Sequence, residues 1–206
     1  MQTFSISIGS GTAFISQLLK LRIFVMISFK AHKIKPVEIL SKTHATGKYN
    51  NSIAYIAKLD INSQKDLDTL VKLHQKWKQI ITEDVCNNFI AKQNGRSFFE
   101  YDDYFILTKQ DKDFNNLDED KILGILQAVR LYLKKDIKIE NLQVNPNTNF
   151  DSSTRNYKQV GHQLIEYIKT RFQGRKIYLQ ANRNAIPFYE KHGFKRIGDS
   201  TKMEYN

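Results

Sequence analysis

One stretch of the chain, Tyr157–Leu164, combines residue types that suit the binding of an anion. Gly161 lies in the first turn of an apolar helical pattern, where glycine is a poor helix former unless a neighbouring group must approach the backbone closely. Free amides at a helix start, with Lys158 beside them, favour a negatively charged group such as a phosphate. An ordinary helix start, in which Gly161 only packs against a strand, is the alternative. The apolar positions that predict the helix are Val160, Leu164, Ile165, Ile168 and Phe172.

The strand expected before this turn has an irregular hydrophobic pattern. Its apolar residues alternate in two pairs that are out of phase, namely Ile137 with Ile139 and Leu142 with Val144. Regular alternation cannot place all four side chains on one face of a sheet. Either they line both faces of a buried strand, or an extra residue near Glu140–Asn141 forms a β-bulge.

Two motifs together resemble the GNAT superfamily of acyl-CoA-dependent N-acyltransferases. The first is similar to (Arg/Gln)-x-x-Gly-x-(Gly/Ala), with Asn156 in the first place, Gln159 at the first glycine and Gly161 at the second. A glutamine at this position can still offer its backbone amide to a phosphate if its φ stays negative, so the departure from glycine does not rule out the motif. The second resembles Asn-x-x-Ala-x-x-x-Tyr-x-x-x-Gly-Phe, and all five fixed positions are present: Asn182, Ala185, Tyr189, Gly193 and Phe194. The two motifs have the family's order and separation and cover about the last third of the chain.

The resemblance implies acetyl-CoA as co-substrate and a primary amine as acetyl acceptor. The amides of the 157–163 turn would hold the pyrophosphate, and the pantetheine arm would pair with the splayed strand. Phe188 would pack against that arm from the other side. The cofactor-binding residues implied in this way are Leu142, Gln143, Val144, Arg155, Tyr157, Lys158, Gln159, Val160, Gly161, His162, Gln163, Asn182, Ala185, Phe188 and Tyr189.

Tyr189 is expected to act as the general acid for the leaving thiolate. A phenol has a reference pKa of about 10, so it stays protonated at neutral pH and can still donate to a thiolate. The alternative is a core tyrosine on a short helix with its hydroxyl at the surface. Glu140, on the bulged strand, is the candidate general base. Glu100, Asp102 and a chain of water molecules are alternatives.

The order of elements predicts an α/β fold with a mixed central sheet. We expect a GNAT-like sheet of six to seven strands, splayed between its fourth and fifth strands and flanked by about four helices. The predicted strands are Ser52–Ile61, Phe98–Lys109, Lys121–Leu131, Lys138–Val144, Lys176–Gln180, Phe194–Ile197 and Lys202–Tyr205. The predicted helices run from Asn62 or Ser63 to Trp77, from Val160 to Phe172 with Gly174 as the stop, and from Ala185 to His192. Val85–Lys92 fits either a helix or an extended segment.

Composition limits the remaining function classes. The 206 residues suit one domain, and the formal net charge is +11. A basic balance fits nucleic acid, an acidic cofactor or solubility alone, and the lysines are spread without dense runs. The single Cys86 excludes an internal disulfide and a cysteine-based metal cluster, and it fits a cytoplasmic protein. The acidic residues between Asp111 and Asp120 have the spacing of a solvated connection, so no metal site is predicted.

Residues 1–45 are predicted to form an N-terminal extension and 46–206 the acetyltransferase domain. Ala13–Phe29 is largely apolar, but Lys20 and Arg22 shorten it below membrane-spanning length, so no membrane association is expected. An added strand or helix, a partly ordered extension and a start at Met26 all fit this region. The expected partner is a small-molecule or protein amine, with a homodimer and nucleic acid as alternatives. The alternative functions are a CoA-binding module that has lost turnover and an RNA- or ribosome-directed acetyltransferase.

Overall fold

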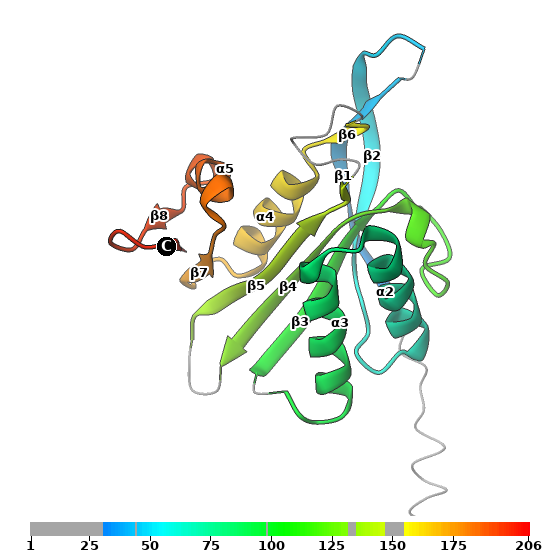
Figure 1. The fold of residues 1–206 in the computed structure, drawn as a ribbon. Coiled ribbons are helices and arrows are strands. Elements are labelled where there is room, and N and C mark those ends of the chain that lie inside the picture. Colours follow the sequence, from blue (N-terminus) through cyan, green and yellow to red (C-terminus); the bar gives the residue numbers. More distant parts are fainter. Residues whose placement is uncertain (1–30, 44, 98, 132–134, 147–154) are drawn as a thin grey trace, which may run out of the picture.

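The computed structural model describes residues 31–43, 45–97, 99–131, 135–146 and 155–206. Within these ranges nine strands form one sheet in the order β6-β1-β2-β3-β4-β5-β7-β9-β8 (Figure 1). The strands are β1 His32–Lys42, β2 Tyr49–Lys58, β3 Phe99–Thr108, β4 Ile122–Leu131, β5 Ile137–Val144, β6 Tyr157–Lys158, β7 Ile177–Gln180, β8 Lys195–Arg196 and β9 Lys202–Tyr205. The helices are α2 Gln64–Trp77, α3 Ile80–Gln93, α4 Val160–Arg171 and α5 Ile186–Lys191, with short 3₁₀ turns at η1 Glu119–Lys121 and η3 Arg183–Ala185. The predicted α/β class and mixed sheet are confirmed, with more strands than the six to seven expected.

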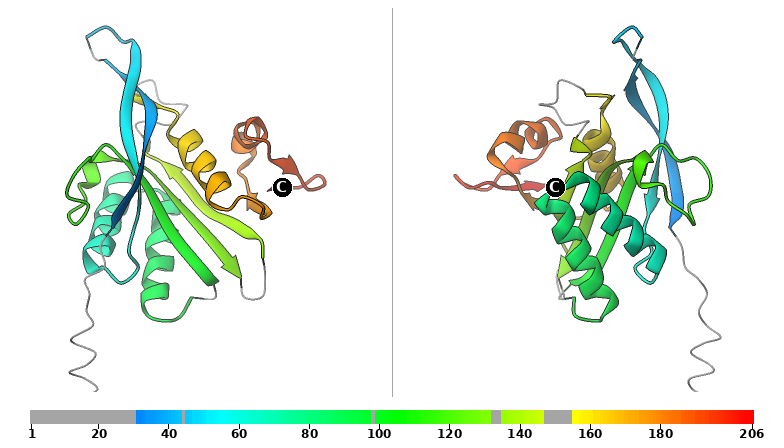
Figure 2. Two further views of the ribbon diagram at one scale, coloured as in Figure 1. Left: turned by 180° about the vertical axis from the view of Figure 1, so that it is seen from behind. Right: turned by 45° about the vertical axis from the view of Figure 1, so that its right-hand side comes forward.

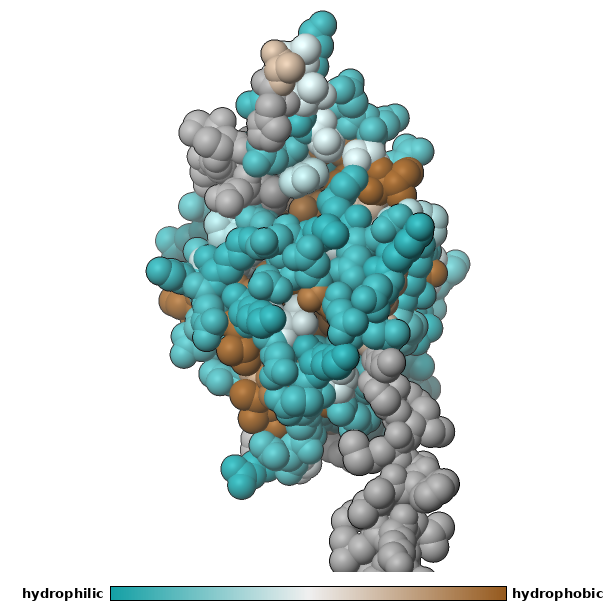
Figure 3. Space-filling view, turned by 90° about the vertical axis from the view of Figure 1, so that its right-hand side faces the viewer, coloured by the Kyte–Doolittle hydropathy of each residue, from teal (hydrophilic) through white to brown (hydrophobic). Residues whose placement is uncertain are grey.

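Helices cover both faces of the sheet. Figure 2 shows α2 and α3 on one face and α4 on the opposite face. The first face is buried around Leu70, Trp77 and Phe89, and the second around Leu164 and Ile168. Seen from the side in Figure 3, the surface is largely hydrophilic with separate apolar spots, and no helix in the described ranges could cross a membrane.

The helix predictions hold with small changes in their ends. α2 begins after Ser63, whose side chain accepts a hydrogen bond from the Asp66 amide. Residues 85–92, which fit two conformations, lie inside helix α3, where Val85, Cys86 and Phe89 are buried. Cys86 is a free thiol there.

The predicted β-bulge is confirmed at Glu140. Asn141 pairs with Gln127 of β4, whereas Ile139 pairs with the next β4 residue, Ala128, so Glu140 has no counterpart. This extra residue resets the alternation and lets Ile139 and Leu142 reach the same core.

The splay is also present. β5 and β7 are parallel, as expected for strands joined by a helix, and pair only over Ile137–Ile139 with Ile177–Leu179. β7 ends at Gln180, so among the described residues the second half of β5 has no strand partner on that side. These are the strands predicted as fourth and fifth. They are numbered β5 and β7 because β1 and β6 add to the predicted set.

The extra strands come from segments with other assignments. His32–Lys42, within the predicted extension, forms β1 and pairs with β2, which starts three residues before the predicted Ser52. Tyr157 and Lys158, assigned to the anion-binding turn, form β6 and pair with Leu40 and Ser41 of β1 (Figure 1). The turn itself is therefore shorter than predicted. Ala13–Phe29 and Met26 lie outside the described residues.

Candidate active site

The start of α4 presents free backbone donors. Gln159 is the residue before the helix, and its side chain makes no capping hydrogen bond. The amide of Gln163 bonds to the Gln159 carbonyl, which leaves the amides of residues 160–162 without an intrahelical acceptor. Such amides, aligned with the helix dipole, favour an anion.

Gln159 adopts a left-handed backbone conformation, with φ of 69° and ψ of 5°. The condition of a negative φ, under which the amide of Gln159 was expected to serve a phosphate, is therefore not met. The link between β6 and α4 needs a residue in the left-handed region, which glycine adopts without steric cost. A side chain at this position costs roughly 1–2 kcal/mol, so this chain keeps the turn of the motif without its glycine.

Gly161 lies where three elements meet. A Cβ on this residue would be 3.2 Å from Cζ of Phe188 on α5 and 3.7 Å from Cγ1 of Val144 on β5. The absence of a side chain therefore lets α5 and the splayed strand approach the start of α4. The two sequence motifs, which are about twenty residues apart along the chain, are brought into direct contact by this packing.

The open edge of β5 carries partly satisfied backbone groups. Leu142 and Val144 are half-buried against the core on the α4 face. The Val144 carbonyl accepts a hydrogen bond of 2.7 Å from Nε2 of Gln143. A side chain of the same strand therefore supplies a donor where β7 has ended.

The charged and amide side chains predicted near the phosphates make contacts within the protein. Nε of Arg155 donates to the Tyr157 carbonyl at 3.1 Å, and Nζ of Lys158 lies 3.7 Å from the ring centre of Tyr49. Nε2 of Gln163 donates to the Glu38 carbonyl of β1 at 2.8 Å. Of these contacts only the one from Gln163 joins α4 to β1, whereas Arg155 and Lys158 contact β6 and β2.

The second motif forms the 3₁₀ turn and α5. Asn182 precedes η3, its side chain is exposed and makes no capping bond, and Ala185 ends that turn. Tyr189 lies in α5 with 8 % of its surface exposed. Its ring packs edge-on against Phe188 and Phe194, at centroid distances of 5.1 and 5.8 Å.

Burial raises the pKa of Tyr189 to about 12. The phenol is therefore protonated at neutral pH, and it is a weaker acid than an exposed tyrosine. Its hydroxyl makes no hydrogen bond to any of the described residues, so it is free to donate to a ligand. The packing of the ring equally fits the alternative of a core tyrosine.

The candidate bases differ in their partners. The Glu140 carboxylate lies 2.6 Å from Nζ of Lys138, and Glu100 lies 2.9 Å from Arg130. Asp102 is buried, and its Oδ1 accepts a hydrogen bond of 2.9 Å from Nε2 of Gln127. Loss of solvent raises the pKa of Asp102, against the opposing effect of this hydrogen bond. Asp102 is thus a stronger base than an exposed aspartate.

Gln127 is part of a buried polar network that sequence reasoning missed. Its side chain is fully buried, and its Oε1 accepts from Asn141, beside the bulge, at 2.8 Å and from Asn88 of α3 at 3.1 Å. The network therefore joins Asp102 to the bulged strand. A glutamine inside the apolar strand 122–131 was the one available signal, because a buried amide needs partners.

A cavity of about 230 Å³ lies at the Asp102 end of this network. Three carboxylates line it, from Asp60, Asp102 and Asp103, together with Lys58, which pairs with Asp103 at 2.6 Å. The cavity is therefore acidic and small.

The splayed sheet and the free amides at the start of α4 are typical of GNAT acetyltransferases, and comparison with known families agrees. The family described as Acetyltransferase (GNAT) domain matches residues 59–205, and this chain belongs to that family. No curated protein sequence matches the chain.

Several solved structures are similar in fold. PaiA N-acetyltransferase from Thermoplasma acidophilum, in complex with coenzyme A, is 15 % identical, with a TM-score of 0.47 over 74 % of this chain and 98 % of that chain. Tetrahymena GCN5 is 15 % identical, with a TM-score of 0.46 over 69 % and 88 %. AtaTR bound with AcCoA is 12 % identical, with a TM-score of 0.49 over 74 % and 92 %.

Proposed function

We propose that this protein is an acetyl-CoA-dependent N-acetyltransferase that acts on a primary amine. The observation that carries the proposal is the opening of the sheet after Ile139, directly beside the free amides at the start of α4. An unpaired strand edge suits the amides of a pantetheine arm, and a helix start suits a pyrophosphate. Gly161 connects the two through Phe188 and Val144, so one extended cofactor can reach both.

In the proposed reaction the amine nitrogen attacks the thioester carbonyl carbon. The carbon–sulfur bond breaks, the nitrogen loses a proton, and the sulfur leaves as a thiolate. Tyr189 is the proposed donor to that thiolate. Because burial raises its pKa to about 12, we assign it a hydrogen bond to the sulfur, with the final proton reaching the thiolate through solvent.

The proposed base takes the proton from the amine. Glu140 stands on the bulge and remains our candidate; its Oε2 is paired with the Lys138 ammonium, which leaves Oε1 to accept the proton. Asp102 is the second candidate because burial raises its pKa and Gln127 links it to the bulge. The acidic cavity next to Asp102 suits the cationic form of a small amine before that proton is lost.

The test is a screen of primary amines with acetyl-CoA that measures release of free thiol, together with calorimetry of CoA binding. We expect CoA binding, turnover with at least one amine, and loss of turnover in Tyr189→Phe. Tyr178→Phe, a half-buried tyrosine of β7, is the matched control. Absence of CoA binding would overturn the proposal, and binding without turnover on any amine, peptide or RNA acceptor would favour the CoA-binding module.

A further inference from the structure

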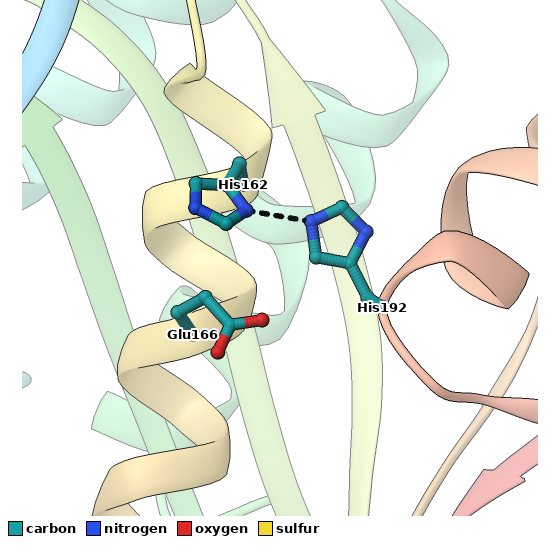
Figure 4. A group of neighbouring side chains, drawn as sticks. All are labelled: His162, Glu166 and His192. Atoms are coloured by element: carbon teal, nitrogen blue, oxygen red, sulfur yellow. Dashed lines mark hydrogen bonds between the residues drawn. The ribbon is translucent and has the colours of Figure 1, made fainter.

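Three potential metal ligands meet between α4 and the end of α5. His162 and Glu166 are four residues apart, so they lie on one side of α4, and His192 follows the last residue of α5 (Figure 4). One ligand atom from each of the three lies within 4.8 Å of the others. His192 is 8 % exposed, whereas the other two are more open to solvent, which leaves a route for an ion.

We propose that His162, Glu166 and His192 bind a divalent transition metal of the zinc class and thereby clamp α4 to α5. Two imidazoles and one carboxylate form a ligand set that zinc uses in proteins, with a fourth position left for water. The proposal concerns the joining of two helices and does not depend on acetyl transfer. It also differs from the sequence-based expectation, in which no metal site was predicted.

The orientation of His192 supports this assignment. Its Nδ1 lies 2.7 Å from the Phe188 carbonyl, which only accepts hydrogen bonds, so Nδ1 carries the proton. The Nε2 lone pair then faces His162, whose Nδ1 is 2.8 Å away (Figure 4). A histidine fixed by a backbone carbonyl through its other nitrogen is the usual arrangement of a metal ligand.

The spacing of the ring nitrogens is close to that of a metal site. With Zn–N bonds of about 2.0–2.1 Å, two nitrogens of a tetrahedral site are about 3.3 Å apart. The His162–His192 pair would therefore open by about half an ångström and replace its hydrogen bond by two metal bonds. Because Nε2 of His192 is the acceptor in that hydrogen bond, Nδ1 of His162 is the donor, and metal binding requires His162 to carry its proton on Nε2 instead, which is its other neutral tautomer.

Lys169 opposes the metal. Its Nζ lies 2.9 Å from Oε1 of Glu166 and donates to the His192 carbonyl at 3.1 Å. An ammonium next to a dication weakens binding by charge repulsion, although Glu166 keeps a second oxygen for the ion. Removing the charge with Lys169→Met should therefore tighten Zn²⁺ binding by several-fold. Variants that remove a metal ligand should weaken it instead.

The test is calorimetry of the full chain with Zn²⁺ after treatment with a chelator and its removal. We expect one ion per chain, at least about tenfold weaker binding in Glu166→Gln and His192→Gln, and a higher Tm with Zn²⁺ that a chelator reverses. His74→Gln is the matched control, because His74 is a half-buried histidine of α2 that contacts Thr82. Co²⁺ in place of Zn²⁺ should give the visible absorption of a low-symmetry site.

Glu166→Gln keeps the test decisive if His192→Gln fails to fold, because the Glu166 side chain is 40 % exposed and its exchange preserves shape. Absence of stoichiometric binding at 100 µM Zn²⁺ would overturn the proposal. So would equal affinity in wild type and Glu166→Gln, which would put the ion elsewhere on the chain.

Discussion

The left-handed conformation of Gln159 gives a prediction that stability measurements can decide. Replacing Gln159 by glycine removes a steric cost of roughly 1–2 kcal/mol in the folded state. Glycine also has more conformational freedom in the unfolded chain, which lowers the free energy of unfolding by roughly 0.5–1 kcal/mol. We therefore expect Gln159→Gly to raise the free energy of unfolding by about 0.5–1 kcal/mol, or Tm by about 1–4 °C.

Two comparisons make this measurement specific. Gln159→Val should lower stability, because a β-branched side chain is a genuine outlier at positive φ. Lys78 also has a positive φ, of 51°, so Lys78→Gly should stabilise the protein at the end of α2, away from the start of α4. CoA affinity should stay within about threefold in both glycine variants, because glycine at 159 keeps the free amides that follow it.

The assay is chemical denaturation of each variant, followed by CoA titration of the folded proteins. A neutral or stabilising Gln159→Val would refute the reasoning, since it would mean that the turn does not need the left-handed region. A large loss of CoA affinity in Gln159→Gly would show that the glutamine side chain itself binds the cofactor.

Three further predictions follow from burial and packing. Tyr189→Phe should lower turnover by roughly 10²-fold with CoA affinity unchanged, while the control Tyr178→Phe keeps the wild-type rate. Equal rates in the two variants would assign the donor role to another group or to water. Gly161→Val should weaken CoA binding and lower Tm together, since its Cβ would meet an aromatic ring at 3.2 Å, and calorimetry showing wild-type affinity would contradict the cradle at the start of α4. Burial raises the pKa of Asp66 to about 6. Between pH 4 and 6 the carboxyl group is therefore still protonated in the folded protein but has lost its proton in the unfolded chain. The contribution of Asp66 to the free energy of unfolding falls as the pH rises through that window. The difference in the free energy of unfolding between Asp66→Asn and wild type should therefore shift in favour of the variant by about 1–3 kcal/mol from pH 4 to pH 7. The same difference for the exposed control Asp68→Asn should show no such trend in denaturation curves.

The bulge and the opening of the sheet could be predicted because their signals are local. A strand has a period of two, so a phase break between Ile139 and Leu142 can be seen without knowing any partner strand. The helices α2 and α4 have similar local signals in their apolar spacing and, for α2, in the Ser63 cap. These parts of the fold needed no long-range information.

β1 and β6 could not be predicted in the same way. Pro36 interrupts the β1 pattern, and proline within an apolar run argues against a strand. β6 has only two residues, and it is a strand because Leu40 and Ser41 of β1 lie beside it. Its existence depends on a contact between segments more than a hundred residues apart.

The candidate site shows the same division. His162 and Glu166 have the spacing of a helical pair, which can be read from the sequence, but the third ligand is thirty residues further on and arrives through the path of α5. The Asp102–Gln127–Asn141 network likewise depends on the register of three strands. The positive φ of Gln159 also had a signal in the sequence, since the glycine that the motif has at this place often marks such a conformation.

Two glycines that allow close backbone packing position the site: Gly124 lies between β4 and α4, and Gly161 lies between α4 and α5. A Cβ on Gly124 of β4 would lie 2.8 Å from Cγ1 of Val160, a distance that real side chains do not allow, so α4 can sit this low on the sheet only because residue 124 has no side chain. Gly161 then lets Phe188 of α5 reach the top of the same helix turn at 3.2 Å. Since Gly124 pairs with Val144 at the open end of β5, the two contacts bring the splayed strand, the helix start and the Tyr189 helix to one place. Polar groups can then act on a cofactor there, because the apolar packing has already fixed where the backbones lie.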